Sequence, residues 1–551
     1  MQFSATSRTT ILDEMQAKPL DILIIGGGIT GAGIALDAAT RGLRVGLVEK
    51  NDFGSGTSSR STKLIHGGLR YLKQMEFALV REVGIERAIV HRLARHLVVP
   101  ERMLLPIIVG GSLNKYLTSI ALWIYDALAG VPNTERRKMI TKAQTLRAEP
   151  LLRDDILKGG GIYYEYRTDD ARLTIEALKT AAQHGALCAN YAQIDSFIYN
   201  TSGKIIGANV YDHIAERSRE IFANTIINAA GPWVDTLRKA DGEPAPKKRL
   251  HLTKGVHIVV PRERLPVQQA VYFDVPADGR MIFAIPRDKI TYIGTTDTDF
   301  NENIDAPNAN KADVAYLLAA TNALFATVQL TAADVVSTWA GLRPLIHEQG
   351  KAAGELSRKD EIFVSPSGLV SIAGGKLTGY RKMAERVLDM VIKQLPNKAQ
   401  FTPCITKTLR LAGGNFDDAA AIEHFILRRS GEAKQAQIPY AVIAEWVGRY
   451  GTNTDWLIEK TYELYATIPD IKTRYISAEL HYAIEQEMVT SLSDFLIRRS
   501  GKLYFDRPAL AQDSLLIAQS MAKILHWDES KTLRQLGAFH KQYEAAMAWK
   551  G

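Results

Sequence analysis

The chain has 551 residues, of which 46% are hydrophobic, and its formal net charge is +8. This length exceeds what one hydrophobic core usually organises, so we expect two or three folded domains. The two cysteines, Cys188 and Cys404, have no partners at metal-ligand spacing; we expect no metal site, no disulfide framework and a reducing, cytoplasmic setting. The charge alone fits an anionic ligand, an anionic membrane or nucleic acid, but no nucleic-acid-binding module is present, so we expect no nucleic-acid partner.

No membrane-crossing or secretory segment is expected. The first 21 residues include acidic side chains and lack the apolar run of a signal peptide. The longest apolar and aromatic stretch, residues 116–132, is interrupted by Asp126 and falls short of the roughly 18 residues that span a bilayer.

The N-terminal elements predict the start of a doubly wound parallel sheet. Residues 21–25 (DILII) form a strand candidate, residues 26–31 a glycine-rich turn, residues 32–40 a helix and residues 44–48 a second strand. This strand, turn, helix and strand order is typical of dinucleotide-binding domains.

The rest of the chain predicts an antiparallel middle section and a helical end. Further strands are expected at residues 225–228, 257–260, 281–285, 289–294 and 369–372, and helices at 380–392, 422–428, 440–450, 477–487 and 510–525. We therefore predict an α/β protein with three parts. These are a discontinuous dinucleotide-binding domain (18–100, 160–240 and 345–395), an antiparallel substrate domain (100–160 and 240–345) and a helical domain (400–551).

The turn at residues 26–31 reads GGGITG, a G-x-G-x-x-G motif between a strand and a helix. Gly26 permits the tight turn, Gly28 lets backbone approach a pyrophosphate, and Gly31 lets the helix pack against the strand. Glu49 follows the second strand, where a carboxylate accepts bonds from ribose hydroxyls. The unit predicts a dinucleotide, NAD or FAD, over the alternative of a glycine-rich turn without a ligand.

Two later motifs favour FAD. Residues 228–233 (NAAGPW) and 373–378 (AGGKLT) each follow a strand with small residues against which a flat cofactor fits. The second opens a helix, whose N-terminus would stabilise negative charge on a reduced flavin ring. Each alone is more often an ordinary turn, but NAD rarely needs three separate contact segments.

Together the motifs resemble one family, the bacterial FAD-dependent glycerol-3-phosphate dehydrogenases among the D-amino-acid-oxidase-like flavoproteins. The resemblance is carried by GGGITGAGIALDAATRGL, TSSRSTKLIHGGLRYL, INAAGPWVD, KGVHIVV, YIGTTDTDF, GLRPL and GGKLTGYRK, in this order. It implies non-covalent FAD, oxidation of sn-glycerol 3-phosphate to dihydroxyacetone phosphate, and transfer of electrons to a membrane quinone.

The resemblance also implies roles for individual residues. Arg343 and Arg358 match positions that the family uses at the substrate, a phosphate dianion to which guanidinium groups are suited, and Arg70 and Tyr71 would line the same pocket. Without the resemblance, each arginine reads as a surface or salt-bridged side chain. The predicted cofactor contacts are Gly26, Gly28, Thr30, Gly31, Glu49, Lys50, Thr57, Ser58, Ser59, Lys63, His66, Gly67, Gly68, Ala230, Gly231, Trp233, Gly375, Lys376, Leu377 and Thr378.

Alcohol oxidation needs a base for the hydroxyl proton. His257 in the strand-like GVHIVV is the first candidate and His66 the second, although His257 also reads as a core histidine. Lys376 would stabilise reduced flavin or a developing alkoxide, and it also reads as a solvated lysine.

Quinone reduction implies peripheral attachment to the inner face of the cell membrane. The candidate surface is residues 116–128, which contain Trp123 and Tyr125, followed by Arg136, Arg137 and Lys138; a buried helix is the other interpretation. Two functions stay open beside the dehydrogenase: an oxidase that makes hydrogen peroxide, and a non-catalytic scaffold. A homodimer is also left open.

Overall fold

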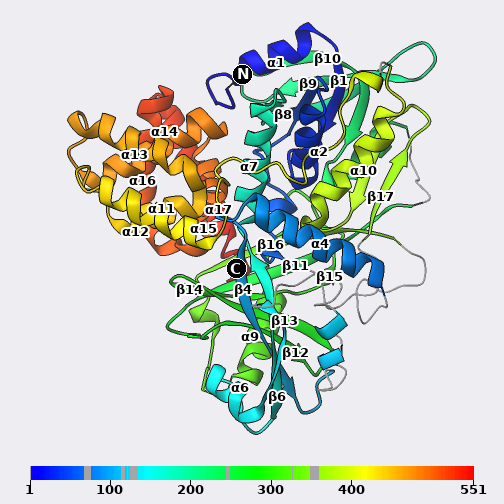
Figure 1. Ribbon diagram of the computed structural model, residues 1–551. Coiled ribbons are helices and arrows are strands. Elements are labelled where there is room, and N and C mark those ends of the chain that lie inside the picture. The colour runs from blue at the N-terminus through cyan, green and yellow to red at the C-terminus, as the bar shows by residue number, and fades with distance from the viewer. Residues whose placement is uncertain are drawn as a thin grey trace.

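The computed structural model describes residues 2–66, 76–112, 118–120, 122–124, 135–242, 248–325, 327–347, 359–396 and 398–550. Figure 1 shows three parts: an upper part around one sheet, a lower part around a second sheet, and a lobe of helices from the C-terminal third beside the upper part. The site described below lies where the two sheets meet.

The first sheet has eight strands among the described residues and is parallel at its centre. Its main order is β17-β18-β10-β1-β2-β7, and β9 and β8 extend from β10. The strands are β1 (Leu20–Ile25), β2 (Val45–Val48), β7 (Leu187–Ala189), β8 (Ala192–Tyr199), β9 (Ile205–Asp212), β10 (Arg217–Asn228), β17 (Asp360–Val364) and β18 (Val370–Gly374). Because β18, β10, β1, β2 and β7 run parallel, the predicted doubly wound fold is confirmed.

Helices cover this sheet. They are α1 (Arg8–Ala17), α2 (Ile29–Thr40), α4 (Phe77–Leu93), α7 (Asp170–Gln183), α8 (Val234–Ala240) and α10 (Tyr380–Ile392). Helix α2 is almost wholly buried, and α7 and α10 pack against it. Glycines allow these close approaches: a Cβ at Gly31 would lie 1.9 Å from Gly26 O, and one at Gly33 would lie 2.8 Å from the Tyr380 ring. The packing role predicted for Gly31 therefore has a direct geometric cause.

The second sheet has ten strands among the described residues and is antiparallel except where β12 meets β4. Its strands are β3 (Leu64–Ile65), β4 (Val99–Ile108), β5 (Lys138–Thr141), β6 (Leu157–Arg167), β11 (Leu250–Pro261), β12 (Ala270–Val275), β13 (Arg280–Arg287), β14 (Ile290–Gly294), β15 (Thr298–Asp299) and β16 (Ser337–Ile346). Helices α6 (Lys142–Ala148) and α9 (Lys311–Leu324) accompany it. Strand β6 lies in this sheet although the predicted dinucleotide-binding range begins at residue 160; the division into domains stays a prediction.

The C-terminal third is helical, as expected. Its helices are α11 (Ala419–Glu432), α12 (Tyr440–Tyr450), α13 (Thr454–Glu463), α14 (Ile471–Glu487), α15 (Lys502–Phe505), α16 (Arg507–Leu525) and α17 (Glu529–Ala545), with a π-helical turn, η10, at Asp494–Arg499. An apolar cluster around Trp446 packs α11 to α14 together.

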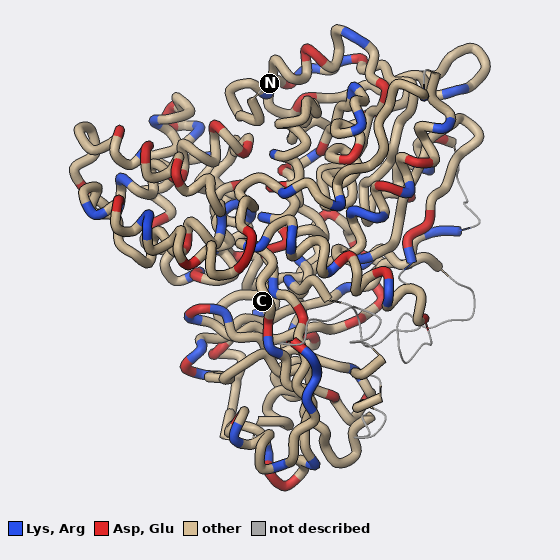
Figure 2. The backbone as a smooth tube through the Cα atoms, viewed as in Figure 1, with Lys and Arg blue, Asp and Glu red and all other residues tan. Residues whose placement is uncertain are grey.

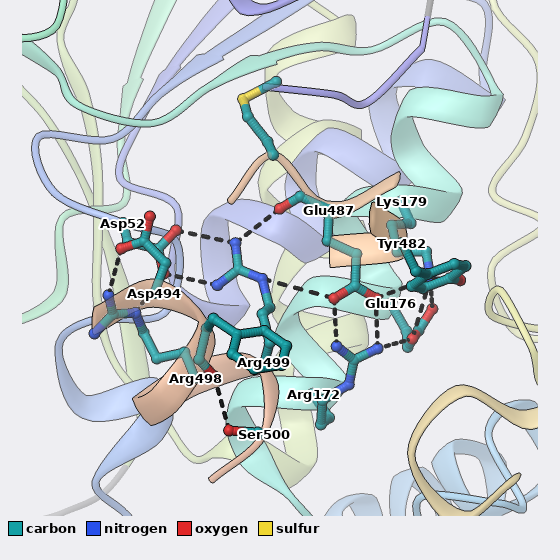
Figure 3. A network of polar contacts seen from close by, with 12 residues as sticks. Asp52, Arg172, Glu176, Lys179, Tyr482, Glu487, Asp494, Arg498, Arg499 and Ser500 are labelled. Carbon is teal, nitrogen blue, oxygen red and sulfur yellow. Dashed lines mark hydrogen bonds and ion pairs between the residues drawn. The ribbon is translucent and has the colours of Figure 1, made fainter. Parts of the chain in front are cut away.

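Buried ion pairs join this helical lobe to helix α7 and to the loop after β2, both of which belong to the part of the molecule around the first sheet. Arg172 Nη1 of α7 lies 2.6 Å from Glu487 Oε2 at the end of α14, and Lys179 Nζ lies 3.2 Å from Glu487 Oε1. Figure 3 shows that Arg499 continues this network to Asp52 in the loop after β2. The lobe is thus attached through charged as well as apolar contacts.

Positively and negatively charged residues are interspersed along all three parts of the chain, as the blue and red segments of the backbone in Figure 2 show. Within the described ranges, no helix is both long and apolar enough to cross a membrane.

Candidate functional site

A cavity of about 1750 Å³ lies between the two sheets and is lined by residues from both. Ordinary small-molecule pockets measure about 300–1,000 Å³. The cavity therefore has room for a dinucleotide together with a second, smaller molecule.

The turn between β1 and α2 forms one end of the cavity. Gly26 has φ +109°, and a Cβ there would lie 2.7 Å from Ala229 O, so only glycine fits. The N-terminus of α2 opens onto the cavity through Gly28, Ile29 and Thr30. The geometry combines close backbone approach with a helix N-terminus, which suits a pyrophosphate.

Glu49, at the end of β2, lies beside this turn. Its Oε2 accepts a hydrogen bond from Gly27 N at 2.7 Å, and its Oε1 accepts one from Asn51 N at 2.9 Å. Burial raises the pKa of Glu49, and the bonds from Asn51 and Gly27 oppose this effect. Each oxygen keeps one further lone pair, which is what binding to ribose hydroxyls requires.

The two later motifs line the same cavity. Gly231 has φ +55°, and Gly374 and Gly375 have φ +78° and +77°, so both segments turn in ways that favour glycine. Thr378 Oγ1 donates to His66 O at 3.3 Å, which brings the third motif against the stretch at residues 57–66. The three glycine-containing segments and Glu49 fit FAD.

At the rim of the cavity, a small cluster joins the two parts of the chain. Trp233 Nε1 donates to Asp305 Oδ1 at 2.9 Å, and Lys50 Nζ lies 2.5 Å from the same oxygen. Lys50 also lies 4.3 Å from the centre of the Trp233 ring. Asp305 holds together two residues that were predicted to contact the cofactor, and no sequence motif marks it.

Arg343 and His257 lie toward the other end of the cavity, on neighbouring strands β16 and β11. Arg343 Nη1 lies 3.1 Å from Asp297 Oδ1, and Nη2 donates to Thr295 Oγ1 at 2.9 Å. Its guanidinium lies over Gly255, since a Cβ there would lie 2.2 Å from Arg343 Nη2. Residues two apart share a face of a strand, about 7 Å from each other, so His257 lies beside this guanidinium.

His257 is buried and its ring stacks on Trp339, with ring centres 4.8 Å apart. Its Nε2 lies 3.0 Å from Thr62 Oγ1, and Nδ1 has no hydrogen-bond partner among the described residues. Burial, then the positive charges of Arg343 and Lys63, hold the pKa of His257 well below 6.5. The imidazole is therefore neutral at physiological pH and able to accept a proton.

Most of the predicted site residues that are described line this cavity. They are Gly26, Gly28, Thr30, Glu49, Lys50, Thr57, Ser58, His66, Ala230, Gly231, Trp233, His257, Arg343, Gly375, Lys376, Leu377 and Thr378. Five predicted residues lie outside the described part of the chain: Gly67, Gly68, Arg70, Tyr71 and Arg358.

Ser59 and Lys63 are placed differently from the prediction, because neither lies among the residues that line the cavity. Lys63 is 2% exposed and its Nζ donates to Asp170 Oδ1 at 2.6 Å and to Ser59 O at 3.0 Å. These bonds tie the loop after Ser58 to the first turn of α7, which is a structural role. Gly31 is also absent from the lining, as its packing against Gly26 requires.

Some lining residues were not predicted. Thr62 contacts the His257 ring, and an apolar group near the second sheet includes Phe77, Leu105, Leu122, Ile124 and Phe283. The position of Thr62 within TSSRSTKLIH was the one available signal for it. The apolar group comes from four distant segments and has no local sequence pattern. Among the described residues, no cluster of His, Cys, Asp and Glu could hold a metal ion.

Two family profiles match the chain. The family described as "FAD dependent oxidoreductase" matches residues 21–381, and the "C-terminal domain of alpha-glycerophosphate oxidase" matches residues 404–532. The first match covers both sheets and the cavity, and the second covers most of the helical lobe.

Individual relatives are similar over nearly the whole chain. The aerobic glycerol-3-phosphate dehydrogenase of Staphylococcus epidermidis is 46% identical over 99% of this chain and 98% of its own. The enzyme of the same name from Bacillus subtilis is 46% identical over 96% of this chain and 95% of its own. The glycerol-3-phosphate dehydrogenase from Bacillus halodurans, solved in complex with FAD, has a TM-score of 0.84 and 43% identity, covering 99% of this chain and 98% of its own.

Proposed function

Since this chain belongs to the family of FAD-dependent oxidoreductases, we propose that it is a glycerol-3-phosphate dehydrogenase, which oxidises sn-glycerol 3-phosphate to dihydroxyacetone phosphate. FAD would supply the hydride acceptor. The observation that carries the proposal is that one cavity joins the dinucleotide-binding turn to Arg343 and a neutral histidine. A non-catalytic scaffold has no need of this second group of residues.

His257 is proposed as the base. When hydride leaves the secondary carbon, the hydroxyl proton must move to an acceptor, and a neutral imidazole within the cavity can take it. Trp339 and Thr62 fix the orientation of the ring. Burial, and then the positive charge of Arg343, lower the pKa of His257, so the histidine is neutral before each turnover.

Arg343 is proposed to bind an oxygen of the substrate. Asp297 and Thr295 hold its guanidinium in one orientation, and its side chain is 20% exposed toward the cavity. A pre-oriented guanidinium binds phosphate or a developing alkoxide with less loss of side-chain entropy. Lys376, at the turn before α10, lines the cavity and would add positive charge near the flavin.

The test is anaerobic addition of sn-glycerol 3-phosphate to the purified, FAD-loaded protein. Loss of the yellow flavin absorbance is expected, and glycerol or glycerol 2-phosphate should leave the absorbance unchanged. A protein that takes up no FAD, or keeps an oxidised flavin with this substrate, would contradict the proposal.

The proposed electron acceptor is a membrane quinone. The apolar group that includes Phe77, Leu122 and Ile124 could receive an apolar head group at the same cavity. A quinone analogue added to the anaerobically reduced protein should restore the yellow colour within seconds, and air should act much more slowly. Rapid recovery in air with production of hydrogen peroxide would favour the oxidase, the second candidate suggested by the family of the C-terminal match.

A peripheral position on the inner face of the cell membrane follows from this acceptor. Ile120 and Trp123 are 54% and 61% exposed, and Arg137 Nη1 donates to Ser119 Oγ at 3.0 Å, which brings the basic run beside them. Apolar side chains next to cations suit an anionic membrane surface. Trp123→Ser should reduce binding to anionic vesicles while leaving reaction with soluble acceptors intact; unchanged vesicle binding would remove this surface from consideration.

A further inference from the structure

Both ends of the segment at residues 49–58 line the proposed FAD site. It begins with Glu49, and Lys50 and residues 55–58 line the cavity. Three hydrogen bonds tie it to the glycine-rich turn. Gly27 N donates to Glu49 Oε2 at 2.7 Å, Gly54 N donates to Gly27 O at 3.0 Å, and Ile29 N donates to Ser58 Oγ at 2.9 Å. The position of this segment therefore sets the shape of the dinucleotide end.

Asp52, in the middle of this segment, does not face the cavity. It is 1% exposed, and its carboxylate points toward the helical lobe (Figure 3). Arg499 Nη1 donates to Oδ2 at 2.7 Å and Nη2 to Oδ1 at 3.0 Å, and Arg498 Nε also donates to Oδ2. Arg498 and Arg499 therefore bond this segment on the side that faces away from the proposed FAD site.

The two arginines belong to the π-helical turn η10. Adjacent residues on a regular helix diverge by about 100°, whereas this turn brings Arg498 and Arg499 onto one carboxylate. Arg499 is fully buried and also donates from Nη2 to Glu487 O at 2.8 Å, at the end of α14. The turn is fixed to the lobe at one side and to Asp52 at the other.

Hydrogen bonds of Asn51 and Asn190 connect the surroundings of Asp52 to Glu49, the carboxylate proposed to bind the ribose. Asn51 N donates to Glu49 Oε1 at 2.9 Å, and Tyr191 N donates to Asn51 O at 2.9 Å. Asn190 Nδ2 bonds both Asp52 Oδ1, at 3.2 Å, and Met488 O, at 3.1 Å. A displacement of Asp52 would therefore move Asn51 and the donor that orients Glu49.

We propose that Arg498 and Arg499 are positioning residues for the FAD site, and that FAD affinity depends on the docking of the helical lobe through Asp52. The lobe then has a role in cofactor retention without contacting the cofactor. This inference rests on the proposed placement of FAD along residues 26–31 and 49–58, and not on the identity of the substrate.

The test uses the full-length apoprotein, with FAD removed, and measures the dissociation constant for FAD by quenching of flavin fluorescence. Asp52→Asn and Arg499→Met should raise this constant at least about tenfold, which corresponds to about 1.4 kcal/mol. Arg499→Lys keeps the charge but loses the two-pronged contact, so an intermediate increase is expected.

Lys179→Met is the matched control. Lys179 is buried in the same interface and bonds Glu176, Tyr482 and Glu487, but none of its contacts reaches residues 49–58. The denaturation midpoint of each apoprotein is measured beside FAD binding. The control should lower the midpoint but keep the dissociation constant within about threefold of the parent.

Two results would overturn the proposal: unchanged FAD affinity in Asp52→Asn, or a loss of affinity in Lys179→Met equal to that in Arg499→Met. If Arg499→Met does not fold, Asp52→Asn and Arg499→Lys decide between these results and the expected one. A parent protein that binds no FAD would contradict the proposed function instead.

Discussion

At the scale of single residues, burial and charge set the protonation state of His257, the proposed base. Burial and two nearby cations keep its imidazole neutral, and Trp339 holds the ring flat. A neutral base that titrates far below the working pH remains available over a wide pH range.

His257→Asn should therefore slow anaerobic flavin reduction by sn-glycerol 3-phosphate by roughly 100-fold, the size of effect typical of losing a general base. In the parent protein the same rate should stay nearly constant as the pH falls through 6.5, because protonation of His257 occurs well below that value. Stopped-flow absorbance measures both.

His251→Asn serves as the control, since His251 lies on the same strand but bonds Asp299 and does not line the cavity. A reduction rate within a few-fold of the parent in His257→Asn would assign the base to another residue, with His66 next.

Residue type and local spacing predicted part of the lining of this cavity. The glycines and Glu49 follow from the strand, turn and helix pattern and His257 from its apolar strand, whereas Arg343 was predicted only through the resemblance to the family. Lys63 was predicted at the cofactor but does not line the cavity, and a lysine near a cofactor motif looks the same in sequence as one that bonds a buried aspartate. Only the distant partner, Asp170, separates the two.

At the scale of elements, strand β11 carries Gly255 beneath the guanidinium of Arg343. Gly255 has no side chain, and the guanidinium of Arg343 occupies the space where a Cβ would lie; the His257 ring follows two residues later on the same strand. A side chain introduced at position 255 would therefore test the orientation of Arg343 without removing any functional group.

Gly255→Ala places a Cβ 2.2 Å from Arg343 Nη2 and 2.6 Å from Thr295 Oγ1. Because the nearest obstructing atoms belong to the end of the long Arg343 side chain, the fold should survive while the guanidinium moves away from Gly255 and Thr295. We expect turnover of sn-glycerol 3-phosphate to fall at least about tenfold, which is about 1.4 kcal/mol of transition-state stabilisation, with FAD still bound. Steady-state kinetics and the flavin content of the purified variant measure this.

Gly537→Ala, in helix α17, is the control. No heavy atom lies within 4 Å of an added Cβ there, and alanine should stabilise the exposed helix by up to about 1 kcal/mol. Parent-like kinetics in Gly255→Ala would show that the orientation of Arg343 does not limit turnover.

Elements were predicted well where the pattern is local. The strand at residues 21–25 and the helices at residues 380–392, 440–450 and 510–525 appear close to their expected bounds, whereas α14 begins earlier than expected and no bounds were predicted for α13 and α17. Strand β6 was not predicted, because its glycine-rich start, Gly159, Gly160 and Gly161, has low intrinsic preference for a strand. Pairing with β4 and β5 determines it instead.

At the scale of the whole molecule, ionisable groups fill the interface between the helical lobe and the dinucleotide-binding part. His96 is buried and has no hydrogen-bond partner on either ring nitrogen within the described residues. Burial, then Arg172 and Lys179, lower its pKa to about 3. Burial alone would raise the pKa values of Asp52 and Glu487, but their arginine and lysine partners lower both to about 2.

These pKa shifts predict that the free energy of unfolding decreases in two steps as the pH is lowered. Below pH 6.5 the unfolded chain protonates His96 while the folded chain does not, so stability decreases as the pH falls. Below about pH 4.5 the unfolded carboxylates take up protons that folded Asp52 and Glu487 exclude, and their contribution is lost as the pH approaches 2.

The urea denaturation midpoint of the apoprotein, measured at pH 7.5, 5.5 and 4, checks this expectation. In His96→Phe the decrease between pH 7.5 and 5.5 should be smaller than in the parent, because one buried neutral imidazole has been removed. His540→Phe, on an exposed position, should retain the full decrease. Equal pH dependence in the parent and His96→Phe would contradict the assignment.

No sequence pattern could reveal this interface. Asp52 and Arg498 are 446 residues apart, and neither belongs to a motif. Their pairing follows from how α7, α14 and η10 meet, which is a property of the assembled chain.

The same separation bears on how the protein is made. A ribosome adds about 5–20 residues per second, so Arg498 follows Asp52 out of the ribosome by roughly 20 to 90 seconds. During that interval the glycine-rich turn and Glu49 are already synthesised, but the carboxylate behind them has no arginine. Stable capture of the cofactor would then belong to the end of biosynthesis, and a prematurely terminated chain lacking η10 would be released without it.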